Sequence, residues 1–173
     1  MRIRNPKPRE ATLVYELQKE VLADLALDLE GVKGQLQMFP EGTFIAEDKQ
    51  DDGSWKPVGM LSSVLWTDDF APDFGKIHGT YPHTHMSTGK VLFIHTIAVL
   101  EARRGKGVGT KLIGEALNLT ALLQLDRVQI ISDKPNLSLL EKLGFAIVRP
   151  LPEFIPYHQA RFVQPMLLEI RLA

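Results

Sequence analysis

Three glycines alternate with other residues in the segment Arg104-Gly105-Lys106-Gly107-Val108-Gly109-Thr110. This segment follows a continuous apolar run, Val91–Val99, and precedes apolar residues at three- and four-residue spacing over residues 108 to about 125. The first pattern is typical of a buried central strand and the second of an amphipathic helix. Residues 128–131 form a further apolar run. We therefore expect a strand, a glycine-rich turn, a helix and a second strand, with the two strands parallel and joined by a crossover.

The glycine-rich turn has the features of an anion site. Its glycines remove three side chains where the backbone turns, so backbone N–H groups can face one point. The helix N-terminus adds partial positive charge, and Arg103, Arg104 and Lys106 add full charges. We expect a phosphate or pyrophosphate to bind here, at the carboxyl end of a strand. The alternative is that the glycines only shape a tight turn.

The residues before this unit predict a strand, two helices and a hairpin. Ile3 stands between two arginines and shortly before Pro6 and Pro8, which suits a short edge strand. Apolar residues at helical spacing predict a helix over residues 12 to about 27, and residues 35–39 suit a short second helix. Residues 43–47 and 58–66 are rich in apolar and β-branched residues and predict a β-hairpin.

The remaining segments complete one domain. Residues 67–90 show no sustained period and form a candidate substrate lid. Residues 135–143 predict a short helix closed by Gly144, and residues 145–148 and 166–170 predict two strands. The elements predict a single domain over residues 1–173 of the α/β (α+β) class, with a mixed central sheet of about six or seven strands flanked by about four helices.

The composition is that of a soluble globular protein. The 173 residues are 45% hydrophobic and 24% charged, with a formal net charge of -1. The sequence contains no cysteine, which excludes disulfide scaffolds, thiolate metal sites and cysteine nucleophiles. The charges form no basic stripe, so we expect no nucleic-acid partner. A charged N-terminus and the lack of a run of roughly 18 to 20 apolar residues predict a cytoplasmic protein without a membrane span.

Two nucleotide-binding motifs fit the turn poorly. A Walker A loop requires Gly-Lys followed by Ser or Thr, whereas the order here is Gly109-Thr110-Lys111. A dinucleotide-binding fingerprint requires a third glycine three residues after the second, and that position is Leu112. The turn therefore needs another explanation.

The turn resembles motif A of the GNAT superfamily of N-acetyltransferases, in which Gln or Arg is followed by two residues, Gly, one residue, and Gly or Ala. The segment Arg104-Gly105-Lys106-Gly107-Val108-Gly109 matches this pattern. Upstream, Ile97-Ala98-Val99 followed by Arg103-Arg104 is similar to the family's central strand, and Glu141-Lys142-Leu143-Gly144-Phe145 is similar to its motif B. The resemblance is close over residues 91–148, and the first half agrees in the order of its elements.

The resemblance implies the acyl-CoA N-acyltransferase fold and acetyl-CoA as the acyl donor. It implies that backbone amides hold the pyrophosphate of the donor, over Arg104, Gly105, Lys106, Gly107, Val108, Gly109 and Thr110. It also implies that the strand Ile97-Ala98-Val99 lies along the pantetheine arm, paired through the backbone of Ile97 and Val99. A common asparagine contact of the family falls on Asn136.

His95 is the leading candidate for the base that takes a proton from the attacking amine. It interrupts an apolar strand just before Ile97-Ala98-Val99, close to where the resemblance places the thioester. The spacing is similar to the His-x-Leu-Ala-Val of arylalkylamine N-acetyltransferases, although Phe93 stands where those proteins have a second histidine. The alternative is a buried histidine that serves only the structure.

The proton donor for the leaving thiolate and any metal site are less well marked. Many members of the family have a tyrosine before the Glu-Lys-Leu-Gly-Phe of motif B, where this sequence has Leu140. The proton donor is then either Tyr157 or solvent. A long loop holds clustered histidines and aspartates at positions His78, His83, His85, Asp68, Asp69 and Asp73. Nothing in that loop predicts a fixed scaffold, so we expect no metal.

The sequence therefore favours an N-acetyltransferase that transfers an acetyl group from acetyl-CoA to a primary amine by direct attack on the thioester. The acceptor, whether a small-molecule amine or a peptide amine, is not indicated by any motif. A non-catalytic acyl-CoA-binding or regulatory module is the main alternative, and a nucleotide-binding protein is another. The sequence also leaves a homodimer open.

Overall fold

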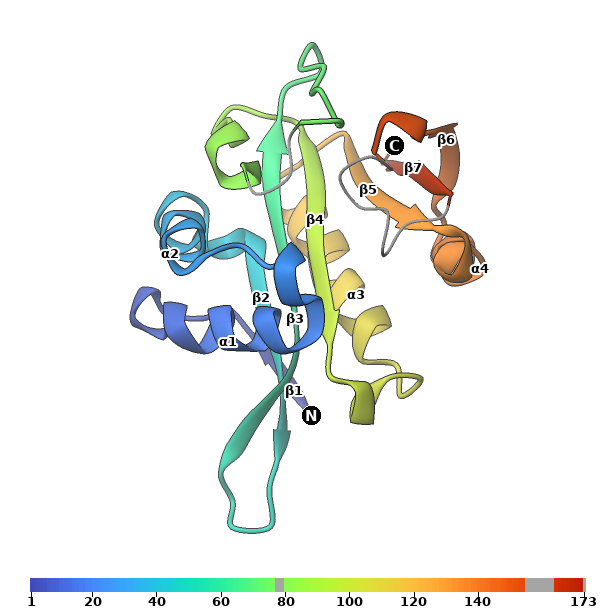
Figure 1. Ribbon diagram of the computed structural model, residues 1–173. Helices are drawn as coiled ribbons and strands as arrows, with labels where there is room; N and C mark the ends of the chain where they lie inside the picture. The colour runs from blue at the N-terminus through green and yellow to red at the C-terminus, as the bar shows by residue number, and fades with distance from the viewer. Residues whose placement is uncertain (77–79, 155–163, 173) are drawn as a thin grey trace.

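One mixed sheet organises the computed structural model, which describes residues 1–76, 80–154 and 164–172 (Figure 1). Within these residues the sheet has seven strands in the order β1-β2-β3-β4-β5-β7-β6. Neighbours are antiparallel except β4 and β5, which are parallel as predicted. The strands are β1 Arg2–Arg4, β2 Thr43–Lys49, β3 Trp55–Trp66, β4 Val91–Val99, β5 Arg127–Asp133, β6 Ala146–Pro150 and β7 Pro165–Arg171.

Four α-helices flank the sheet in the described residues: α1 Ala11–Leu22, α2 Leu29–Met38, α3 Val108–Leu122 and α4 Lys134–Lys142. Helices α1 and α2 lie in front of the sheet in Figure 1, whereas α3 lies behind β3 and β4. The predicted α/β class and the single domain with a mixed sheet of six or seven strands and four helices are confirmed. None of the described helices is long and apolar enough to cross a membrane.

Strand β4 is buried on both faces, which explains its continuous apolar run. Leu92 and Ile94 pack into the core cluster that contains the buried face of α3, including Leu112. Ala98 packs instead into the cluster beneath α1 and α2, beside Val14. A helix layer on each side of one strand leaves no position for alternating polar side chains.

The first predicted helix ends earlier than its periodicity indicates. Helix α1 stops at Leu22, and Ala23 takes a positive φ of 50° before a short 3-10 turn. The reversal brings the buried Leu27 back onto the core, where its N–H donates to the Oε1 atom of Gln18 at 3.3 Å. Tertiary packing therefore overrides the helical pattern beyond Leu22.

The second helix is longer than predicted and begins at a cap that the sequence prediction missed. Helix α2 starts at Leu29 rather than Gln35, and the side chain of Asp28 accepts a hydrogen bond from the N–H of Gly31 at 2.7 Å. Aspartate is a preferred N-cap residue, so this start had a sequence signal. The low helix propensity of Gly31 and Gly34 hid it.

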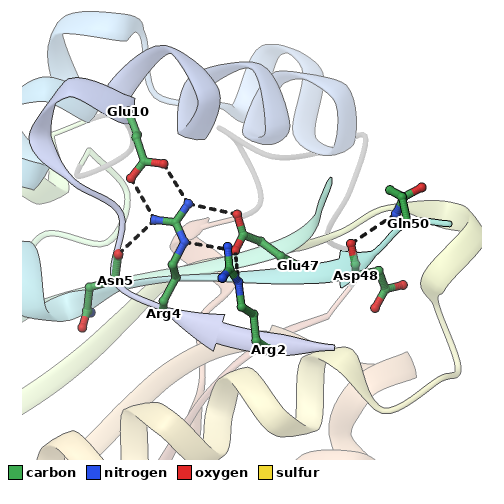
Figure 2. Close-up of polar contacts among 7 residues, drawn as sticks. All are labelled: Arg2, Arg4, Asn5, Glu10, Glu47, Asp48 and Gln50. Carbon is green, nitrogen blue, oxygen red and sulfur yellow. Dashed lines mark hydrogen bonds and ion pairs between the residues drawn. The ribbon is translucent and has the colours of Figure 1, made fainter. Parts of the chain in front are cut away.

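An ion-pair network fixes the edge strand β1 against β2 and the turn before α1 (Figure 2). The buried carboxylate of Glu47 accepts hydrogen bonds from Arg2 at 2.7 Å and from Arg4 at 2.9 Å. Arg4 also donates two hydrogen bonds to Glu10, at 2.7 and 2.8 Å. Burial raises the pKa of Glu47, but the arginine hydrogen bonds lower it more, so the net shift is downward. The network stabilises a three-residue strand that has little core contact of its own.

Candidate active site

A β-bulge in β4 places two polar side chains on one face of the sheet. Strand β3 pairs Ser63 with Ile94 and Ser62 with Thr96, so His95 has no partner in β3. Successive strand residues normally point to opposite faces, but a bulge turns the extra residue toward its neighbour. The Nδ1 atom of His95 accordingly lies 2.9 Å from the Oγ1 atom of Thr96.

The two parallel strands separate just beyond this bulge. Strand β5 pairs with β4 only over Val91–Ile94, whereas β5 continues to Asp133 beside β7. Beyond Ile94, no described strand pairs with the β5 side of β4. A cleft of about 770 Å³ opens there, lined by both strand ends. The opening lies at the carboxyl ends of parallel strands, where open α/β sheets bind ligands.

The glycine-rich turn forms one end of this cleft. Gly105 and Gly107 have positive φ values of 72° and 77°, and Gly107 is the N-cap of α3 without a side-chain cap. Gly109 lies inside the first turn of α3 and needs no positive φ. A Cβ atom added at any of these three glycines would meet nothing within 4 Å. The first N–H groups of α3 therefore have no side-chain cap, and no Cβ atom stands on the three glycines beside them.

The cleft brings together nine of the eleven residues predicted to bind the donor, namely Ile97, Val99, Arg104, Gly105, Gly107, Val108, Gly109, Thr110 and Asn136. Ala98 does not line the cleft because its side chain is buried on the α1 face. Lys106 is exposed on the turn and is not part of the lining. The Nε atom of Arg104 donates to the carbonyl of Val99 at 3.2 Å, which ties the turn back to the strand.

A buried glutamine determines which ring nitrogen of His95 carries the proton. The Nε2 atom of Gln35, on α2, donates to the carbonyl oxygen of Ser63 at 2.8 Å. Its Oε1 atom, 3.4 Å from the Nε2 atom of His95, can only accept a hydrogen bond. His95 therefore carries its proton on Nε2, and Nδ1 accepts a hydrogen bond from the hydroxyl of Thr96.

The arrangement of these elements agrees with the comparisons. The family model described as Acetyltransferase (GNAT) family matches residues 11–145. The chain belongs to the GNAT acetyltransferase family. No curated protein matches its sequence.

Solved structures share this GNAT fold along the whole chain. The loading GNATL domain of CurA from Lyngbya majuscula is 17% identical, with a TM-score of 0.80 and coverage of 98% of this chain and 96% of that chain. A NatC complex bound to Gag peptide and CoA contains a chain with 19% identity, a TM-score of 0.71 and coverage of 99% and 98%. The GphF GNAT-like decarboxylase in complex with isobutyryl-CoA is 14% identical, with a TM-score of 0.73 and full coverage of 100% of both chains. Proteins with different chemistry thus share this GNAT fold, so the fold alone does not specify the reaction.

His95 in this GNAT cleft is uncharged over the whole neutral range. It is partly exposed to the cleft but surrounded by protein, and burial lowers its pKa to about 3. The ring of Tyr81 stacks on it at a centroid distance of 5.1 Å and an interplanar angle of 9°. Because Tyr81 covers a face of the His95 ring, the ring interacts with other groups through the nitrogen atoms at its edge.

Tyr81 is a cleft residue that the sequence prediction missed. It lies in the 3-10 turn Tyr81–Thr84 of the long loop before β4, is 6% exposed, and lines the cleft. Burial raises the pKa of its phenol, so the group stays protonated and can donate a hydrogen bond. No periodicity or motif marks this residue, because only tertiary packing brings the loop to the site.

The remaining positions named from the sequence are Leu140, Tyr157 and the histidines and aspartates of the long loop. Leu140, at the usual tyrosine position of GNAT proteins, is 3% exposed and lines the cleft with an apolar side chain. Tyr157 and His78 lie outside the described residues. Across residues 1–76, 80–154 and 164–172, no group of three or more His, Asp or Glu side chains could hold a metal ion.

Proposed function

We propose that this GNAT protein is an N-acetyltransferase that transfers an acetyl group from acetyl-CoA to a primary amine. The observation that carries the proposal is the opening between β4 and β5, which joins the uncapped N-terminus of α3 to the bulge at His95. One continuous cleft therefore offers an anion site at one end and polar side chains further along it.

The residues that line the cleft suit acetyl-CoA as the acyl donor. N–H groups at the start of α3 and the positively charged Arg104 suit a pyrophosphate, which a helix N-terminus favours electrostatically. The unpaired edge of β4 beyond Ile94 supplies backbone donors and acceptors for the two amides of a pantetheine arm, as an added strand would. A chain bound along this edge leads from the glycine-rich turn toward Thr96 and His95.

The hydrogen-bond network defines a path for the amine proton. In the proposed reaction the neutral amine nitrogen attacks the thioester carbon, the C–S bond breaks, and the nitrogen loses one proton. The hydroxyl of Thr96 already donates to Nδ1 of His95, so its free lone pair can accept an N–H of the amine. His95, with its pKa near 3, is too weak a base to retain the proton and acts by orienting and polarising the Thr96 hydroxyl. The proton that the nitrogen loses ends on the departing sulfur, so the products are the acetylated amine and the thiol of CoA.

The departing thiolate takes up the proton that the amine loses, and the chain offers Tyr81 and Tyr157 to assist it in place of the missing tyrosine at Leu140. Tyr81 is the better supported of the two because its protonated phenol lines the cleft and can donate a hydrogen bond to the sulfur. The apolar Leu140 also favours a second function, a non-catalytic acyl-CoA-binding module. The two functions share the donor site and differ only in turnover.

The test combines binding with turnover. Coenzyme A and acetyl-CoA should raise the melting temperature, since a ligand that binds only the folded state stabilises it. Amine-dependent release of the CoA thiol from acetyl-CoA, together with acetylated amine detected by mass, would establish the transferase. Protection by CoA without release of thiol across a broad amine panel would favour the binding module. Absence of protection by any CoA compound would overturn both functions.

A further inference from the structure

The cleft wall beside the His95 and Thr96 pair is apolar. It is built from the end of α1, the segment that follows it, the loop before β4, strand β4 itself and the turn Pro152–Phe154. It consists of Val21, Leu22, Leu25, Leu27, Tyr81, Phe93 and Phe154. We refer to these seven residues as the apolar wall. In Figure 1 the turn after α1 lies in front of β4, on the opposite side of the sheet from α3.

The apolar wall is where an acceptor would enter. The glycine-rich turn occupies the end of the cleft at the start of α3, and the unpaired edge of β4 runs from there to His95. One face of the His95 ring contacts this wall, because the ring stacks on Tyr81. If the donor is bound at the turn and along β4, then the remaining approach to Thr96 passes over the apolar wall.

Negative charge is scarce around this approach. Among the described residues that line the cleft, Asp133 is the single carboxylate, and its Oδ1 atom already accepts a hydrogen bond from the N–H of Gln164 at 2.8 Å. Arg104 adds positive charge to the same cleft, whereas the Nε atom of Arg103 is paired with Asp48 at 2.6 Å. The sequences of residues 77–79 and 155–163 contain no Asp or Glu. A second ammonium group on an acceptor would lose its hydrating water here. No carboxylate of the described lining is free to take the place of that water.

We infer that the acceptor is a primary amine whose substituent is apolar, aliphatic or aromatic, rather than a polyamine or an amino sugar. This inference rests on the proposed transferase function. Each CH₂ group buried against the wall should raise kcat/KM by about fourfold, the equivalent of roughly 0.8 kcal/mol per buried CH₂. The chemistry is common to small amines and to peptides whose N-terminal residue is apolar.

The test measures kcat/KM with n-alkylamines from propylamine to hexylamine, with 2-phenylethylamine, and with spermidine. We expect a rise with chain length until the wall is covered, and at least a tenfold preference for 2-phenylethylamine over spermidine. Peptides that begin with Phe or with Lys form a second arm, and a higher value for the Phe peptide than for any small amine would identify peptides as the source. Acetylation of spermidine as efficient as that of the apolar amines would overturn the inference while leaving the transferase intact. If CoA protects the fold but no amine is acetylated, the proposed function fails instead.

A substitution in the wall gives an independent readout. Leu25 is partly exposed on the turn after α1, so a polar side chain there should be tolerated. Leu25→Asp should lower kcat/KM for 2-phenylethylamine at least tenfold and raise it for spermidine. The control is Leu122→Asp, because Leu122 is 78% exposed at the end of α3, outside the cleft lining. Equal selectivity in Leu25→Asp and Leu122→Asp would overturn the role of the wall.

Discussion

At the scale of single residues, the site depends on which hydrogen bonds the His95 ring makes. Gln35 fixes the proton on Nε2, and the remaining lone pair on Nδ1 is directed at the hydroxyl of Thr96. A histidine with an ordinary pKa would add an acidic limb near pH 6.5 to a rate profile. Because burial lowers the pKa of His95 to about 3, we expect no limb from this residue between pH 5 and 8.

The first prediction concerns the hydroxyl of Thr96. Thr96→Val removes the group that faces both His95 and the amine, so we expect acetyl transfer to fall by roughly 10²-fold, the lower range for a positioned acid or base. The affinity for CoA should remain near that of the wild type, because the glycine-rich turn is unchanged. Steady-state rates and CoA titration measure the two effects.

The matched control is Thr43→Val. Thr43 lies two strands away on β2, where its hydroxyl is 3.3 Å from that of Ser62, and it is not part of the cleft lining. The same isosteric change there should leave the rate within about twofold of the wild type. The lost hydrogen bond should lower only the free energy of unfolding. Equal losses of rate in both variants would remove Thr96 from the proton path.

The second prediction concerns the backbone of Gly107. Gly107→Ala places a side chain on a residue whose φ is 77°, and the first N–H groups of α3 would shift away from the donor. A left-handed conformation costs an L-residue about 1 to 2 kcal/mol. We expect at least a tenfold loss of CoA affinity, measured by calorimetry. Gly53→Ala is the control, because Gly53 has a φ of 82° and open space around it in the β2–β3 hairpin, far from the site. If both variants bind CoA like the wild type, the turn does not hold the donor.

At the scale of elements, short segments of this fold are stabilised by a few specific contacts. The bulge in β4 turns the side chain of His95 toward Thr96, and the ion pairs of Glu47 hold β1 to the sheet. Both depend on residues whose partners are more than 30 positions away in the sequence. Neither feature follows from helix or strand propensity.

The third prediction concerns Glu47. Glu47→Gln removes a charge that two arginines share in a buried position, so we expect the free energy of unfolding to fall by about 1 to 3 kcal/mol in urea titrations. The control is Glu30→Gln, which breaks an exposed ion pair with Lys33 on α2 and should cost less than about 0.5 kcal/mol. A loss in Glu47→Gln no greater than that in Glu30→Gln would contradict a structural role for the network.

At the scale of the whole molecule, acid should destabilise the fold in two stages. The folded-state pKa of His95, about 3, is below its ordinary value of 6.5, so between these values the unfolded chain binds more protons. Stability therefore falls as pH decreases from about 6.5 toward 3. Hydrogen bonds from Arg4 lower the pKa of Glu10 to about 2, so a further loss follows as pH falls from 4.5 toward 2.

The fourth prediction isolates the first stage. Between pH 6.5 and 5, His95 should contribute a slope of up to about 1.4 kcal/mol per pH unit to the free energy of unfolding. His95→Gln should reduce this slope, whereas His83→Gln, on an exposed histidine of the loop before β4, should not. Urea titrations at half-unit pH intervals measure the slopes. An identical slope in wild type and His95→Gln would mean that folding does not lower the pKa of His95.

The sequence by itself determined the features that are local or periodic. The glycine-rich turn, the continuous apolar run of β4 and the helical spacing of α3 each depend on residues close together in the chain, so they could be predicted, and with them the family. The bounds of α1 and α2 could not, because the reversal at Ala23 depends on the packing of Leu27 against distant residues.

Only the tertiary structure decided the chemistry of the cleft. The bulge that turns His95 toward Thr96 depends on the register against β3, and the tautomer of the ring depends on Gln35, 60 positions away. Tyr81 comes from a loop without periodicity, and only the packing of the core brings it to one side of β4 together with the rest of the apolar wall. Hydrogen-bond partners and desolvation depend on distances in space, and a one-dimensional pattern does not contain them.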